Sequence, residues 1–330
     1  MKIIYIFLLF FLVSFELFSD VRSIDTTRFT VQFVKTLNGT EDFAENEGFF
    51  SKVAGFFLGH DIMKFVKPIN LIAFDTNKLI VLDPGLYTPI LYDYNERDFI
   101  LLNEDIKTSM QSLVGITQIN DNEVVFSDSE LNKIFFYNLK TSNITSLNDS
   151  LKLNKPTGIA YLKSRKQIWI AETGNHRLIV TDLKGNILHT FGERGDSTGM
   201  FNFPTFIWIN NDKDLVYVTD ALNFRVQIFT PDFELKSAFG HSGDAAGYFA
   251  SMKGIAVDTY GHIFVVDAIL NSVQVFDIYG NYLYNFGRQG RNPGEFWMPS
   301  GIFIDQNNYI YVTDSYNCRV QIFHLIKAQY

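Results

Sequence analysis

A short apolar run that ends in an acidic residue recurs six times along the chain, and this repeat constrains the fold more than any other feature. The runs include "VYVTD" and "IYVTD", and the acids are separated by 45, 44, 48, 47 and 47 residues. Internal repeats of this period are typical of architectures in which each unit packs mainly against its neighbours. We call these acids the marker acids; they are Asp83, Asp128, Glu172, Asp220, Asp267 and Asp314.

Each repeat contains four short segments rich in β-branched and aromatic residues. In the fifth repeat they cover about 254–258, 262–266, 273–277 and 282–286, and segments of this composition favour strands. Four strands per repeat of this length predict one blade of a β-propeller. The chain is therefore predicted to be all-β, with residues 20–330 forming one propeller of six four-stranded antiparallel blades.

The last repeat has no fourth strand of its own, because too few residues follow its third strand. The segment "VKTLN" at 34–38 resembles the fourth strands of earlier repeats, such as "LYNFG" at 283–287. A strand at about 29–37 is therefore expected to pair into the last blade. This pairing would close the ring and cover the two open edges at the seam.

Three connectors between repeats share the pattern G-x-x-G-x-x-x-G-x-F, at 192–201, 240–249 and 287–296. A glycine-rich segment can hold phosphate when a helix follows it, but here a strand follows each connector. The glycines are instead expected to adopt positive φ angles, and the phenylalanine is expected to enter the core.

The N-terminus carries Lys2 followed by thirteen residues without a charge, at 3–15. This run is shorter than the roughly 20 residues of a membrane span and is typical of a signal peptide, with Ser19 at the cleavage point. Residues 1–19 are therefore predicted to direct export to the periplasm or the outside, with no further membrane insertion. An uncleaved membrane anchor is the alternative. The single cysteine excludes an intrachain disulfide, so packing must stabilise the domain.

Residues 156–192 resemble an NHL repeat, whose usual pattern is P-x-G-I-A-V-D, then I-Y-V-A-D-x-x-N-H-R, then a final F-G. The letters N-H-R at 175–177 match the triplet that names the family, and 317–319 keep its outer residues. The fifth repeat departs from the triplet, with Leu, Asn and Ser. The resemblance is specific over 153–326 and weak over 60–150. It implies a six-bladed propeller and by itself implies no function.

Cys318 stands in the middle of its triplet, where other repeats carry His176, Phe224 and Asn271. A nucleophile cannot be exchanged for phenylalanine at equivalent sites, so Cys318 is interpreted as a variable turn residue. A reactive thiol is the alternative, but no histidine keeps a fixed offset from it.

Strands alternate in direction within a blade, so the glycine-rich connectors and the turns after each second strand are expected on one face, the loop-rich face. Loops on a rigid scaffold carry most binding sites, and a protein partner or an anionic ligand is predicted to dock here. The candidate residues are Arg177, Arg225, Arg319, Arg194, Arg288, Arg291, His176 and His241. The alternative is local pairing of each turn arginine with its marker acid.

An enzyme is the second functional hypothesis. Some propellers that resemble this one are metal-dependent lyases or hydrolases, such as the peptide-amidating lyase, with a site at the mouth of the central channel. The six histidines share no equivalent inner position, so no histidine cage, catalytic residue or cofactor is predicted. A structural calcium with oxygen ligands is left open.

The formal net charge of −8 argues against nucleic-acid binding, although intracellular NHL propellers include RNA binders. Sequons at Asn38, Asn143 and Asn148 matter only in a source that glycosylates them. The sequence thus predicts an exported, monomeric NHL-type propeller that acts as a binding scaffold for an unidentified partner.

Overall fold

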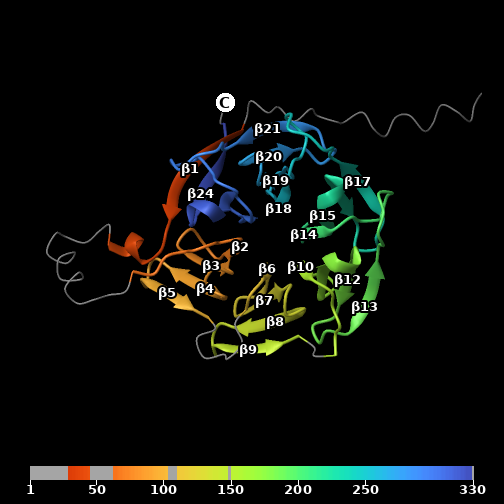
Figure 1. Ribbon diagram of the computed structural model, residues 1–330, viewed down its shortest axis with the longest axis horizontal. Coiled ribbons are helices and arrows are strands. Elements are labelled where there is room, and N and C mark those ends of the chain that lie inside the picture. Colours follow the sequence, from red (N-terminus) through yellow and green to blue (C-terminus); the bar gives the residue numbers. More distant parts are fainter. Residues whose placement is uncertain (1–28, 45–61, 103–109, 148–149, 329–330) are drawn as a thin grey trace, which may run out of the picture.

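A computed structural model describes residues 29–44, 62–102, 110–147 and 150–328. These residues form six four-stranded antiparallel sheets arranged as a ring, which Figure 1 shows along its axis. The first strand of each blade faces the centre, and the fourth lies on the outside. The prediction of an all-β, six-bladed propeller is confirmed. The predicted signal peptide, residues 1–19, and Asn148 lie outside the described residues.

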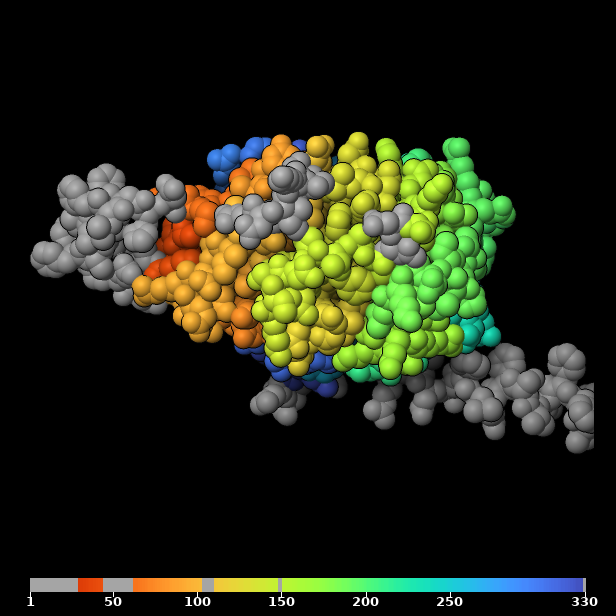
Figure 2. All heavy atoms as spheres, turned by 90° about the horizontal axis from the view of Figure 1, so that it is seen from below, coloured from red at the N-terminus to blue at the C-terminus, as the bar shows by residue number. Residues whose placement is uncertain are grey.

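The strands of blades one to three follow one another along the chain. Blade one contains β2 (Asn70–Ala73), β3 (Lys78–Asp83), β4 (Thr88–Asp93) and β5 (Asp98–Leu101). Blade two contains β6 (Leu113–Asn120), β7 (Glu123–Asp128), β8 (Lys133–Asn138) and β9 (Asn143–Ser146). Blade three contains β10 (Pro156–Leu162), β11 (Gln167–Glu172), β12 (Arg177–Thr181) and β13 (Ile187–Phe191). Figure 2 shows these three blades side by side from orange to green, forming one outer wall.

Blades four and five repeat this order. Blade four contains β14 (Pro204–Asn210), β15 (Leu215–Asp220), β16 (Arg225–Phe229) and β17 (Leu235–Phe239). Blade five contains β18 (Met252–Val257), β19 (Ile263–Asp267), β20 (Ser272–Phe276) and β21 (Tyr282–Phe286). The four strands predicted for the fifth repeat agree with these bounds to within two residues.

The last blade joins the two ends of the propeller. It contains β22 (Ile302–Ile304), β23 (Tyr309–Asp314), β24 (Arg319–Lys327) and β1 (Phe29–Leu37), in the order β1-β24-β23-β22. The register pairs Phe29 with Lys327 and Leu37 with Val320. The predicted closure by an N-terminal strand at about 29–37 is therefore confirmed. It covers the outer edge of β24, which would otherwise present unpaired backbone groups.

The hydrophobic core lies between neighbouring blades, because each sheet has apolar side chains on both faces. One cluster joins Trp169 of β11 to Val218 of β15, and both side chains are fully buried. The connector phenylalanines Phe201, Phe249 and Phe296 are also fully buried, as predicted. Packing of this kind makes each blade depend on its neighbours.

The inner strands approach one another closely at glycines. A Cβ on Gly301 of blade six would lie 2.6 Å from the Cα of Asn70 and from the carbonyl oxygen of Ile69 in blade one. The Ser315 hydroxyl donates to the Pro68 carbonyl across the same junction at 2.6 Å. The glycine of the P-x-G-I pattern is thus needed where two blades come into contact at the channel.

The glycine-rich connectors fold back on themselves. In the connector entering blade four, Gly195 donates its backbone N–H to the Phe201 carbonyl, and Phe201 donates to Glu193. Gly192 and Gly199 have φ angles of 92° and 75°, so the predicted positive φ is confirmed for these two glycines, whereas Gly195 between them does not have one. None of the helices among the described residues is long and apolar enough to cross a membrane.

Candidate functional site

Every marker acid links a connector to a turn through hydrogen bonds. Each of the six is fully buried and accepts a hydrogen bond from the backbone N–H of the connector that enters its own blade. In blade four, for example, Asn202 donates to Asp220 at 2.6 Å. Connectors and turns therefore meet on one end of the ring, which is the predicted loop-rich face. The recurrence of the acids is structural.

The turn arginines of blades four and six are also bound internally. Arg319 donates to the Asp314 carboxylate at 2.7 Å and to three backbone carbonyls of the connector, those of Arg291, Asn292 and Glu295. Arg225 does the same with Asp220 and with three carbonyls of its own connector. Local pairing with the marker acid, the alternative to a binding role, is confirmed for these two arginines.

A glutamine in the third strand completes this network, and sequence analysis missed it. Gln321 donates to the Glu295 carbonyl at 2.7 Å and accepts from the Gly294 N–H at 2.8 Å. Gln227 and Gln274 hold their connectors in the same way. The signal was present in the repeated letters "VQIF" and "VQVF", since a fixed glutamine among apolar residues needs buried partners.

The middle position of the NHL triplet lies in the left-handed backbone region in all six blades. The residues are Tyr87, Asn132, His176, Phe224, Asn271 and Cys318, with φ between 52° and 59°. Three of these side chains accept a backbone N–H from the connector entering the next blade, where Lys155, Phe203 and Met298 donate. A small polar or imidazole side chain at this position therefore links consecutive blades.

Cys318 makes a different contact at this position. Its thiol donates to the carbonyl of Val66 at 3.0 Å, and burial, together with Asp83 and Asp314, raises the pKa of the thiol. A raised pKa disfavours the thiolate that a nucleophile requires. The geometry agrees with the interpretation of Cys318 as a turn residue.

His176 is neutral in this arrangement. Its Nδ1 accepts the N–H of Phe203 at 3.1 Å, and its ring lies 4.4 Å from the Phe203 ring. Burial lowers the pKa of His176, and the positive charge of Arg194 lowers it further, while Asp220 opposes the shift. Protonation at Nδ1 would break the link between blades three and four.

The remaining arginine and histidine candidates are more accessible. Arg177 pairs with Glu172 at 2.5 Å, and 36% of its side chain is exposed. Arg288 is highly exposed and pairs with Glu295 at 2.8 Å. Arg194 and His241 are exposed on connectors, and the guanidinium of Arg291 lies 5.2 Å from the Trp297 ring centre. The role of these residues in binding stays a prediction.

Large exposed apolar side chains, absent from the predicted site, lie at equivalent turns of three blades on the loop-rich face. Leu222, Ile269 and Tyr316 each follow a marker acid by two residues and are 52%, 57% and 53% exposed. The Tyr316 ring lies 5.8 Å from that of Trp297, which carries Arg291 on its face. Blades one to three have Gly85, Glu130 and Gly174 at this position. We call Leu222, Ile269, Tyr316 and Trp297 the apolar arc.

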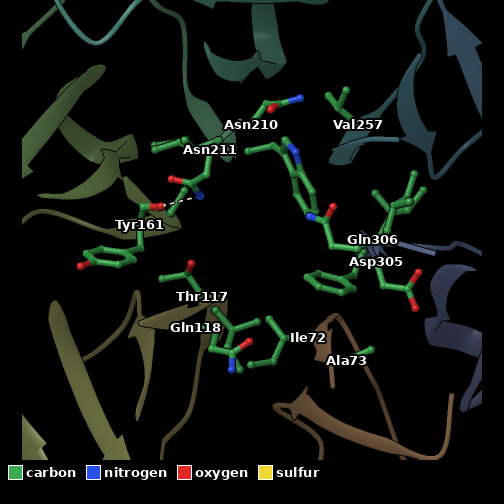
Figure 3. Close-up of a pocket in the computed structure, with 18 of the residues that line it drawn as sticks. Ile72, Ala73, Thr117, Gln118, Tyr161, Asn210, Asn211, Val257, Asp305 and Gln306 are labelled. Atoms are coloured by element: carbon green, nitrogen blue, oxygen red, sulfur yellow. Dashed lines mark hydrogen bonds between the residues drawn. The ribbon is translucent and has the colours of Figure 1, made fainter. Parts of the chain in front are cut away.

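A second candidate lies on the ring axis. A cavity of about 520 Å³ is lined by the first strands of all six blades and by the turns that follow them. It opens on the face opposite the loop-rich face. Figure 3 shows Thr117 and Gln306 directed toward this cavity, whereas the Asp305 carboxylate and the Tyr161 ring point away from it.

The metal-dependent alternative has no ligand set among the described residues. No group of three or more His, Cys, Asp or Glu side chains there is placed to hold a metal ion. His262 is buried and bonds to Asp258 at 2.6 Å. His189 lies in β13 and His324 in β24, so these three histidines do not converge.

Comparisons with known proteins agree with the repeat and with the ring. Residues 153–181 match the family model of the NHL repeat, and residues 249–330 match DUF5128, described as a 6-bladed beta-propeller. Together with the six blades, these matches define the class: the chain is a six-bladed propeller in which one segment, 153–181, matches the NHL repeat. The predicted resemblance is confirmed.

Curated relatives are similar over a short part of this chain. A stretch of 88 residues is 31% identical to the E3 ubiquitin-protein ligase NHLRC1 of Homo sapiens and covers 27% of this chain and 22% of that protein. A stretch of 94 residues is 31% identical to NHL repeat-containing protein 2 of Gallus gallus and covers 26% of this chain and 13% of that protein. The matches thus span less than a quarter of these relatives.

Solved structures share the fold at low identity. An auxiliary nutrient binding protein from Bacteroides thetaiotaomicron has a TM-score of 0.66 at 10% identity, over 91% of this chain and 77% of that chain. Virginiamycin B lyase from Staphylococcus aureus has a TM-score of 0.59 at 15% identity, over 90% of this chain and 100% of the lyase. At these identities the similarity supports the propeller architecture alone.

Proposed function

We propose that this protein is an exported binding scaffold that docks a protein partner on its loop-rich face, with the apolar arc at the centre of contact. This proposal rests on the exposure of Leu222, Ile269 and Tyr316, which occupy the same turn position in three consecutive blades. Exposed apolar side chains that recur on one face, here beside the Trp297 ring, mark a surface for a partner. Rigid turns hold them in fixed positions, so docking loses little conformational entropy.

The composition of the apolar arc also favours a protein partner. Trp297, Tyr316 and Arg291 form a small cluster, in which the two rings are tilted by 44° and the guanidinium lies over the indole ring. Tryptophan, tyrosine and arginine are the residues most often found at the energetic centres of protein interfaces. Stacking on Trp297 holds the Arg291 guanidinium in place without neutralising it. The partner is therefore expected to place apolar side chains on the arc and a carboxylate beside Arg291.

The comparisons support a protein-binding role only in a general way. The matches cover 22% and 13% of the two relatives, so the ligase activity in the name of one of them is not carried over. Export is proposed from residues 1–19 alone, on the signal-peptide pattern described above.

Affinity capture from the exported fraction of the source tests the proposal. The bait is the protein without residues 1–19, run beside Tyr316→Ala and Arg291→Glu. Arg225 and Arg319 are unsuitable for this purpose, because their substitution would release the connectors. The matched control is Tyr279→Ala, since Tyr279 is 63% exposed and lies in the turn between β20 and β21, on the opposite face.

The expected result is one partner whose affinity falls about thirtyfold with Tyr316→Ala, the loss typical of an interface hot spot. The Tyr279→Ala protein should bind it as the wild type does. A partner that both tyrosine variants hold equally would place docking elsewhere and overturn the proposed face.

A further inference from the structure

The cavity on the ring axis is separate from the apolar arc and opens on the other face. Its outer part is formed by the turns between first and second strands, which include Asp121, Lys163, Asp212, Thr259 and Gln306. Its volume of about 520 Å³ falls within the range of small-molecule sites, about 300–1,000 Å³. It is therefore large enough to enclose a small molecule.

Two aromatic side chains meet inside this cavity. The rings of Trp208 in blade four and Phe303 in blade six lie 5.6 Å apart in an edge-to-face arrangement. Blades four and six are not neighbours in the ring, so this contact crosses the channel in front of blade five. Both rings are partly exposed. They give the cavity an apolar surface that a ligand can contact.

Several polar groups of the cavity have no partner within the described chain. The Thr117 hydroxyl, the Gln306 amide and the Trp208 indole N–H line it and make no hydrogen bond to another described residue. Asn211 differs, because its amide already links the Lys163 N–H to the Tyr161 carbonyl. The free groups are uncharged donors and acceptors arranged around the two rings.

The charged side chains around the cavity either bond to neighbouring residues or occur in equal numbers of both signs. Asp305 accepts from the backbone N–H groups of Asn307 and Tyr309 and from the Tyr311 hydroxyl. Asp258 is bonded to His262. The other charged lining residues are two aspartates and two lysines: Asp121, Asp212, Lys163 and Lys213. In total the lining carries four aspartates and two lysines, an excess of negative charge that disfavours an anion. The Asp305 carboxylate points away from the cavity and Asp258 is bonded to His262, so neither is directed at a cation, and an uncharged ligand fits the cavity best.

We propose that this cavity binds a neutral saccharide of one or two rings. A pyranose has one face of C–H groups, which packs on aromatic rings such as Trp208 and Phe303. Its hydroxyl groups both donate and accept, and so match the Gln306 amide, the Thr117 hydroxyl and the indole N–H. A purely apolar ligand would leave these groups without partners, which costs affinity.

Titration of the purified protein with maltose, cellobiose, lactose and N-acetylglucosamine tests the proposal. Binding is followed by calorimetry and by tryptophan emission, because Trp208 lies in the cavity. At least one sugar should bind saturably at millimolar concentration or below. Gln306→Ala should weaken this binding about tenfold, the loss expected for one hydrogen-bonding group, and Trp208→Ala should abolish it.

Gln289→Ala is the control, since Gln289 lies in a connector on the loop-rich face. Gln306 is exposed, so its substitution is not expected to disturb folding. The proposal is overturned if no sugar of the panel binds, or if binding survives both Gln306→Ala and Trp208→Ala. A preference for glucose 6-phosphate or citrate over every neutral sugar would also overturn it. None of these outcomes affects the apolar arc, so the two proposals fail independently.

Discussion

The buried carboxylate of Asp314 accepts the backbone N–H of Trp297 at 2.7 Å, although seventeen residues separate them. The same carboxylate binds Arg319, Asn317 and Gln321. One acid therefore fixes a turn, a connector and the start of the third strand. This multiple use explains why the acid recurs in every blade and why Trp297 is held in a defined position beside Tyr316.

Asp314→Ala should unfold the protein far more readily than an ordinary surface substitution. It leaves the buried guanidinium of Arg319 without its carboxylate, and removal of one partner of a buried ion pair costs about 3–5 kcal/mol. Chemical denaturation measures the free energy of unfolding. Asp232→Ala is the control, because Asp232 is exposed and pairs with Arg165 at the surface. Equal losses in the two variants would contradict the structural role of the marker acid.

Stability should depend on pH through His176. Its folded-state pKa is lowered from 6.5, so the neutral form is favoured in the folded protein. The stabilisation is complete above the unfolded pKa of about 6.5 and is lost as the pH falls through the folded pKa. In His176→Asn an amide oxygen replaces the acceptor, as Asn271 does for Met298.

The measurement compares the free energy of unfolding of wild type and His176→Asn across this pH range. The wild type should lose stability relative to the variant on acidification, since all other titrating groups are common to both. Parallel curves would show that His176 carries no such linkage.

Cys318 should tolerate glycine and reject valine. Its φ of 55° is accessible to glycine, whereas the left-handed region costs a side-chain-bearing residue about 1–2 kcal/mol and suits β-branched residues least. Thermal unfolding of Cys318→Gly and Cys318→Val tests this. The glycine variant should melt at or above the wild-type temperature and the valine variant below it. The reverse order would mean that the thiol contact to Val66 outweighs backbone strain.

Gly301→Ala should loosen the junction between the last blade and the first. The added methyl group would lie 2.6 Å from the backbone of blade one, and such overpacking costs about 1–3 kcal/mol. Ser300→Ala at the neighbouring position should change the free energy of unfolding by less than about 0.5 kcal/mol. Chemical denaturation of the two variants measures both free energies of unfolding. A Gly301→Ala protein as stable as the wild type would refute the close approach of the two blades.

The ring could be predicted from the sequence because its determinants are periodic. The marker acids, the connector glycines and the β-rich segments recur at fixed offsets, and the similarity of 34–38 to later fourth strands indicated how the ring closes. Each of these features can be recognised within one repeat or by comparing one repeat with another. The positions of strands within a blade follow from them.

The candidate site could be predicted only in outline. Connectors and turns share one face, as predicted, but the arginines that were expected to form a binding site there include Arg225 and Arg319, which hold the connectors. Whether a charged side chain faces solvent or a carbonyl depends on the folded connector, which a repeat pattern does not describe. The contact of Trp208 with Phe303 depends on the diameter of the ring, and the exposure of Tyr316 depends on how its turn is held.

Photo-cross-linking shows directly whether a partner docks on the loop-rich face. A photoreactive amino acid replaces Tyr316 in one protein and Tyr279 in a second, and both are irradiated with the exported fraction of the source. The protein labelled at 316 should cross-link to a single partner, and unlabelled wild-type protein should compete for this partner. Cross-linking of the same partner from 279 and not from 316 would contradict it.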